Sequence, residues 1–276
     1  MRCSTSVARG SGFRVDTVTC LDDHRGWSSA EVENHYRVVL VRRGTFRRMA
    51  DGRHAVADPT MAYLAVPGVE ERFAHPAGGD VCTALTLAPG LWRAIIGHGP
   101  GRSADLAFYV DARLDLLHRR LLRAARDGDT AFEVVEAMLP LVGAATGGPA
   151  GGPRSAGGPA RARTSAAAVV DAAREAISAD VPEAAGLVSL AEFLGVSPYR
   201  LSRAFTREVG VSLTHYRNRV RVGRALDRLE HGEPSLATLA ADLGFADQAH
   251  LTRTIRRHCG HTPAALRRLL TAQHTD

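Results

Sequence analysis

Two short stretches near the C-terminal end carry similar side chains at nearly the same spacing. The first is LSRAFTREVG, from Leu201 to Gly210, and the second is LTRTIRRHCG, from Leu251 to Gly260. Each follows a Leu-Gly pair, at 194–195 and 243–244, so the offset is 49 residues at the glycine and 50 from the leucine onward. Hydroxyl and guanidinium groups at such a spacing can form hydrogen bonds with bases and phosphates. The repeat predicts two copies of one small structural unit.

A helical wheel divides each stretch into an apolar and a polar edge. Stepping about 100° per residue places Phe205 beside Leu201, and Ile255 beside Leu251. Arginine can bond guanine at two positions, glutamine can do so with adenine, and a threonine or alanine methyl can touch thymine. For any single polar residue, the alternative to a DNA contact is a helix face that is only exposed to solvent. Matching positions in two copies favour contacts with DNA bases. The predicted DNA-binding residues are Tyr199, Arg200, Ser202, Arg203, Gln248, Ala249, Thr252, Arg253 and Arg256.

The elements that would hold these residues are helices with marked starts. Cap signals, two of them followed directly by proline, occur at Ser197, Asp247 and Thr262, and Ser189 with Glu192 has the spacing of a capping box. Residues 212–230 have room for one long helix, ended by His231-Gly232. The predicted order is helix, turn, helix, long connecting helix, helix, turn, helix.

The region from about 187 to 270 resembles the DNA-binding domain of AraC/XylS-type transcription regulators. Both units, the connecting helix and the sequence Gly244-Phe245-Ala246-Asp247-Gln248 carry the resemblance. It implies two helix-turn-helix units, whose second helices enter the major groove about one turn of DNA apart. It also implies double-stranded promoter DNA and RNA polymerase as partners, with activation commoner than repression. Ile255, His258-Cys259 and Leu266 replace the family's frequent aromatic residues, which affects packing more than DNA contacts.

The charge distribution agrees with a nucleic-acid partner. The net charge is only +6, but eight arginines face two acidic residues between 197 and 228, and five arginines face none between 248 and 275. Such stretches suit phosphate neutralisation. All 35 basic residues are arginine, for which biased genomic composition is as good an explanation as function.

A change of composition divides the chain. Residues 146–163 are rich in glycine, proline and alanine and predict a flexible linker. The predicted domains are therefore 1–145 and 164–276, the second being the DNA-binding domain. A balance of 45% hydrophobic and 23% charged residues is that of globular proteins.

The first domain begins with strand signals and ends with helical ones. Segments 35–41, 45–49, 61–66 and 81–87 predict strands of a small barrel or sandwich, and leucine spacing predicts helices over 111–126 and 130–142. The strands and the segment from Pro67 to His75 loosely resemble the cupin-like effector-sensing and dimerisation domain common in that family. The predicted fold is thus α+β: a cupin-like β-barrel with appended helices, then an all-α domain. The helical pair 111–142 could be a lid or a subunit contact, and we expect a homodimer.

The remaining polar residues give weaker predictions. Trp27, His35, Tyr36 and Arg37 are the candidate lining of a small-molecule effector pocket. Histidines 24, 35, 54 and 75 lack the His-x-His and glutamate pattern of catalytic cupins, so we predict no metal, no cofactor and no enzyme. A cupin-type metal enzyme with an accessory DNA-binding domain is the alternative.

Cysteine usage and hydropathy bear on location. Cysteines 3, 20, 82 and 259 are scattered without a CxxC pair, which favours free thiols in a reducing compartment. No stretch approaches the roughly 18 apolar residues of a membrane span. We therefore expect a cytoplasmic protein with no membrane partner.

Overall fold

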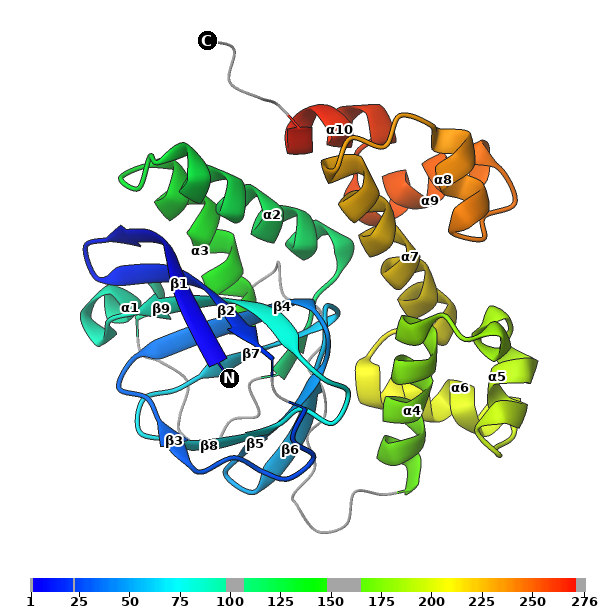
Figure 1. Cartoon of the computed structure of the whole chain (residues 1–276), viewed down its shortest axis with the longest axis horizontal. Helices are drawn as coiled ribbons and strands as arrows, with labels where there is room; N and C mark the ends of the chain where they lie inside the picture. Colours follow the sequence, from blue (N-terminus) through cyan, green and yellow to red (C-terminus); the bar gives the residue numbers. More distant parts are fainter. Residues whose placement is uncertain (1, 22, 98–106, 148–164, 272–276) are drawn as a thin grey trace.

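The structure is a computed structural model that describes residues 2–21, 23–97, 107–147 and 165–271. A sheet-rich N-terminal half lies against an all-helical C-terminal half (Figure 1). The predicted α+β class is confirmed. Most of the predicted linker lies outside the described residues.

The strands form two antiparallel sheets. The larger has the order β1-β2-β9-β4-β7-β10 and the smaller β3-β8-β5-β6. Their bounds are β1 Arg2–Gly10, β2 Phe13–Cys20, β3 Glu31–Val32, β4 Tyr36–Arg43, β5 Phe46–Ala50, β6 Arg53–Ala57, β7 Met61–Ala65, β8 Glu70–Ala74, β9 Asp80–Leu87 and β10 Ala107–Tyr109.

Alternating side chains of the larger sheet supply two cores. Val39 and Val41 of β4 point toward the smaller sheet, where they pack with Phe46. Val38 and Leu40 point the other way, into a core shared with the helices. This period-2 pattern is that of a strand buried on both faces. No ladder joins the two sheets within the described strands, so the predicted closed, cupin-like barrel is not confirmed.

The N-terminal half also has three described helices, one before β10 and two after it. They are α1 Pro89–Ile96, α2 Ala112–Asp127 and α3 Glu133–Ala145, of which the last two correspond to the predicted helical pair. Asp111 caps α2 by accepting from the backbone N–H groups of Arg113 and Leu114. All three helices contribute to the core of the larger sheet, through Trp92, Leu121 and Met138.

The C-terminal half is helical throughout its described residues. Its helices are α4 Ser165–Ala179, η1 Pro182–Ala185, α5 Leu187–Phe193, α6 Pro198–Val209, α7 Leu213–Glu230, α8 Leu236–Asp242, α9 Gln248–Cys259 and α10 Pro263–Thr271. The predicted caps at Ser197 and Asp247 are confirmed. The capping box at Ser189 is wrong: α5 begins after Gly186, and the Ser189 hydroxyl donates to the carbonyl of Glu183.

The long helix α7 packs against both the N-terminal half and its own neighbours. Tyr216 joins a core with Met61 and Tyr109, whereas Val222 and Leu226 join another with α8, α9 and α2. The two halves therefore share hydrophobic cores, although a long segment connects them.

Candidate nucleic-acid interface

The two repeat units have the same pattern of exposure. Across residues 201–210 and 251–260 the burial class agrees at every position but one, where Glu208 is half-buried and His258 is buried. Leu201 and Leu251 are fully buried, as are Phe205 and Ile255. The wheel therefore placed the apolar edge of both helices correctly.

In the first unit, α6 exposes the predicted residues. Ser197 caps the helix by accepting from the backbone N–H of Arg200. Tyr199 is 70% exposed, Arg203 is exposed and Ser202 is half-buried. The Arg203 guanidinium donates to the Tyr199 hydroxyl at 2.8 Å, so the two side chains form one polar group on the surface.

In the second unit, α9 exposes a different set of side chains. Asp247 caps the helix by accepting from the backbone N–H of His250 at 2.6 Å. All the predicted residues are exposed except Thr252, which is half-buried: Gln248, Ala249, Arg253 and Arg256. Ala249 occupies the place that Tyr199 has in the first unit. The two helices thus offer unlike surfaces on one scaffold.

The connecting helix α7 fixes the separation of the two units. Its 18 residues span about 27 Å at 1.5 Å per residue. Tyr216 lies edge-on to Phe205, with ring centroids 5.1 Å apart, while Leu226 packs with Leu251 in the second unit. A rigid spacer of this length suits two helices that enter grooves about 34 Å apart.

Several arginines of the basic stretch are engaged within the protein. Arg219 of α7 is only 2% exposed; it donates to the carbonyls of Val110 and Pro59 and pairs with Asp115 at 3.1 Å. Arg228 pairs with Glu233 and Asp242. The charge density of the sequence therefore overstates the charge available to DNA.

A network of ion pairs joins α2 to α7. Arg119 donates to Asp227 at 2.8 Å and to Glu230 at 2.6 Å. Burial opposes the charge on Asp115, but Arg119 and Arg219 outweigh it and hold the pKa of that carboxyl below its ordinary value. This junction was missed at the sequence level. Arg219 shares the helix face of Tyr216 and Val222, which is the signal that could have found it.

A further arginine connects α4 to the smaller sheet and its following turn. Arg174 donates to the carboxylate of Asp58 and to the carbonyl of Val56. Nothing in the spacing of these residues distinguished them, because they lie 116 positions apart.

The four predicted effector residues do not gather around one cavity. Tyr36 stacks on Trp92 at 4.2 Å, on the helix-covered side of the larger sheet. Trp27 contacts His54, His35 is exposed, and only Arg37 of the four lines the cavity between the two sheets. The structure instead brings His24 against His75, which the sequence did not pair.

Comparisons with known proteins concern chiefly the C-terminal half. Residues 190–269 match the family described as a helix-turn-helix domain. The arabinose operon regulatory protein of Escherichia coli is 30% identical over 81 residues, which is 29% of this chain and 28% of that protein. The HTH-type transcriptional regulator RipA of Corynebacterium glutamicum is 40% identical over 78 residues, which is 28% of this chain and 23% of that protein.

The chain thus spans less than a third of the length of these two relatives. Both are named as regulators, which agrees with the predicted DNA-binding regulator and does not favour the cupin-enzyme alternative. The crystal structure of ToxT from Vibrio cholerae O395 aligns with 95% of this chain and 99% of its own, at 10% identity and a TM-score of 0.35. That likeness is too weak to carry an argument. No described helix is long and apolar enough to span a membrane.

Proposed function

We propose that this protein is a sequence-specific regulator of transcription that binds promoter DNA through both units, because residues 190–269 match a helix-turn-helix family and resemble the AraC/XylS type. The observation that carries the proposal is the duplicated helix with matching buried and exposed positions. The same proposal includes activation through RNA polymerase, a homodimer, a cytoplasmic location and a cupin-like N-terminal half.

The geometry of the exposed side chains suits two kinds of DNA contact, to bases and to phosphates. Arg203 and Arg253 stand one residue after a small hydroxyl residue on each outward face, where a guanidinium can bond guanine at two positions. Gln248 in the first turn of α9 can bond adenine in the same way. Arg200 and Arg256 lie beside these groups and suit phosphate oxygens.

The test is a binding series with the full-length chain. Preferred duplexes are first selected from a random pool, and affinities are then measured by gel shift at several salt concentrations. We expect Arg203→Ala and Arg253→Ala each to lower affinity for the selected duplex by about 5- to 150-fold, while changing affinity for random duplex little. Affinity of the unchanged protein should fall steeply with salt.

Arg72→Ala is the matched control, because Arg72 is a partly exposed arginine of β8 paired with Glu70. It should leave the binding series unchanged. If both recognition-helix variants kept the preference of the unchanged protein, the assignment of the two helices would be wrong.

We further propose that a small molecule controls the protein through its N-terminal half. A cavity of about 470 Å³ lies where the two halves meet and supports this proposal. Thr45 and Arg47 line one side of it, and Arg174, Glu175 and Val220 line the other. A molecule bound there would contact both halves at once, so it could change how α7 is held.

The effector proposal is tested by a thermal-shift screen of small metabolites. An effector should raise the melting temperature of the unchanged protein and alter its affinity for the selected duplex. Val220→Trp, which fills the cavity, should abolish both responses. A compound that stabilised this variant equally would be bound elsewhere.

A further inference from the structure

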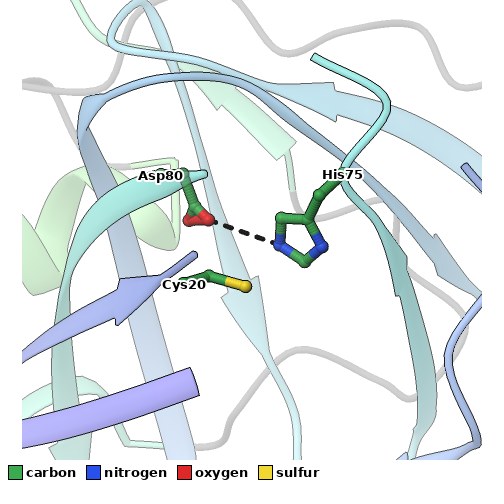
Figure 2. A group of neighbouring side chains, drawn as sticks. All are labelled: Cys20, His75 and Asp80. Carbon is green, nitrogen blue, oxygen red and sulfur yellow. Dashed lines mark ion pairs between the residues drawn. The ribbon is translucent and has the colours of Figure 1, made fainter. Parts of the chain in front are cut away.

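A group of metal-ligating side chains lies inside the N-terminal half, far from the recognition helices. Cys20, His75 and Asp80 each offer one ligand atom, and the three atoms lie within 4.8 Å of one another (Figure 2). All three residues are buried. They also line the cavity of about 170 Å³ between the two sheets.

The backbone holds these side chains together. Cys20 and Asp80 are direct partners in the ladder between β2 and β9, so their side chains lie next to each other on one face. Gly79 allows the close approach, because a Cβ atom there would lie 2.4 Å from the carbonyl oxygen of Cys20. His75 follows the end of β8, and its backbone N–H donates to the carbonyl of His24.

Hydrogen bonds around the histidines determine which nitrogen faces the group. His24 Nδ1 lies 2.8 Å from the carbonyl oxygen of Gly26, which can only accept, so Nδ1 carries the proton. In neutral His24 the Nε2 atom is then an acceptor, and it lies 3.2 Å from His75 Nδ1. His75 must therefore donate from Nδ1. Its Nε2 is left with a lone pair directed toward Asp80.

That arrangement brings a lone pair against a carboxylate. His75 Nε2 lies 3.3 Å from Asp80 Oδ2, yet Oδ2 is buried and has no hydrogen-bond partner among the described residues. Asp80 is only 6% exposed, so bulk water does not compensate. Two acceptors at this distance require a positive charge between them, supplied by an added proton or by a cation.

We propose that Cys20 Sγ, His75 Nε2 and Asp80 Oδ2 bind a divalent transition-metal ion of the zinc class. Tetrahedral zinc, with bonds of about 2.0–2.3 Å, holds its ligand atoms roughly 3.3–3.8 Å apart, a range that includes the 3.3 Å between His75 and Asp80. A set of sulfur, imidazole and carboxylate ligands selects such ions over magnesium or calcium. Three protein ligands leave a fourth position for water or a small molecule in the cavity.

The surroundings complete the site. The Cys82 thiol donates to Asp80 Oδ1 at 3.2 Å, which orients the carboxylate and leaves Oδ2 for the ion. Arg2, which lines the same cavity, is paired with Glu31 at 2.7 Å and so adds little repulsion.

The test uses the tag-free, full-length chain after chelator treatment. Zinc is titrated in competition with a chromophoric chelator, and cobalt is added separately to observe thiolate-to-cobalt charge-transfer absorption. We expect one ion per chain and the charge-transfer band. Cys20→Ser should lose the band, and Asp80→Asn and His75→Gln should bind zinc at least tenfold more weakly. Magnesium should not compete.

The controls distinguish ligands from neighbours. Cys82→Ser should keep the cobalt band, with zinc affinity lowered by about 10-fold or more as for other residues that orient a ligand. Cys3→Ser, at an exposed thiol, should change neither measurement. Circular dichroism of the metal-free variants checks that each is folded. If Cys20→Ser does not fold, the zinc affinity of Asp80→Asn decides the question. Absence of stoichiometric zinc, or a band that persists in Cys20→Ser, would overturn the proposal.

Discussion

Two arginines of the same basic stretch have opposite surroundings. Arg203 on α6 is exposed and donates to Tyr199, whereas Arg219 on α7 is 2% exposed and joins α7 to α2 and to the backbone of the N-terminal half. Both arginines add the same charge to the sequence. The first is available to DNA, and the second is part of the structure that holds the DNA-binding half in place.

The difference follows from position on the helix rather than from composition. Arg203 lies opposite the buried edge formed by Leu201 and Phe205, while Arg219 lies three residues from both Tyr216 and Val222, which are buried. An arginine within an apolar stripe must find partners inside the protein, because an unpaired buried charge costs several kcal/mol. Arginine-rich stretches in DNA-binding chains should therefore be divided by helix face before their charges are counted.

The largest effect should come from Arg219→Ala. The change leaves Asp115 with less positive charge nearby and removes the donor to the carbonyls of Val110 and Pro59. Removing one partner of a buried pair costs about 3–5 kcal/mol, so the free energy of unfolding should fall by that order. Urea denaturation followed by circular dichroism measures it.

Arg203→Ala is the matched control for this change, since it truncates an exposed arginine of the neighbouring helix. Its effect on the free energy of unfolding should stay within about 0.5 kcal/mol. Equal effects of the two substitutions would remove the distinction drawn between the two arginines.

The buried His118 should make the stability of the fold depend on pH. Burial, with help from Arg42, lowers the pKa of His118 to about 3 from its ordinary 6.5, and its Nε2 lies 2.7 Å from the Thr83 hydroxyl. A lowered histidine pKa means that the neutral form stabilises the fold above pH 6.5, and that this stability is lost as the pH falls toward 3. From pH 7.5 to pH 5 the loss should be about 2 kcal/mol.

Denaturation of the unchanged protein and of His118→Gln at both pH values isolates this contribution. The variant should lose about 2 kcal/mol less than the unchanged protein over that interval. Arg120→Gln, on the exposed face of the same helix, should follow the unchanged protein. Parallel pH profiles for all three chains would contradict the buried, neutral histidine.

Local signals predicted the C-terminal half well because its residues act close to their place in the sequence. The caps at Ser197 and Asp247, the long helix after Ser212 and the buried Leu201 and Leu251 all depend on spacings of a few residues. Ser189 was misread since a capping box fits its sequence, whereas the backbone enters α5 two residues earlier.

The N-terminal half was less predictable because its residues meet through long-range pairing. Strands β1 and β2 were missed, and the neighbourhood of Cys20 depends on the ladder that pairs it with Asp80. His24 and His75 are 51 residues apart, and the four scattered histidines gave no sign that two would touch. Register between distant strands is fixed by the whole core, which a single sequence does not show.

The smallest effect should come from Tyr199→Phe, which tests the exposed side of the comparison. The change removes the hydroxyl that accepts from Arg203, but the ring stays beside the guanidinium, 5.6 Å from its centroid. Both side chains are exposed, so stability should change by less than about 0.5 kcal/mol. Affinity for the selected duplex should fall only a few-fold, because the hydroxyl orients Arg203 rather than replacing it. Ser4→Ala, which removes an exposed hydroxyl of β1 outside the predicted DNA-binding residues, is the control for a lost hydroxyl. A Tyr199→Phe loss as large as that of Arg203→Ala would make Tyr199 itself the base-reading group.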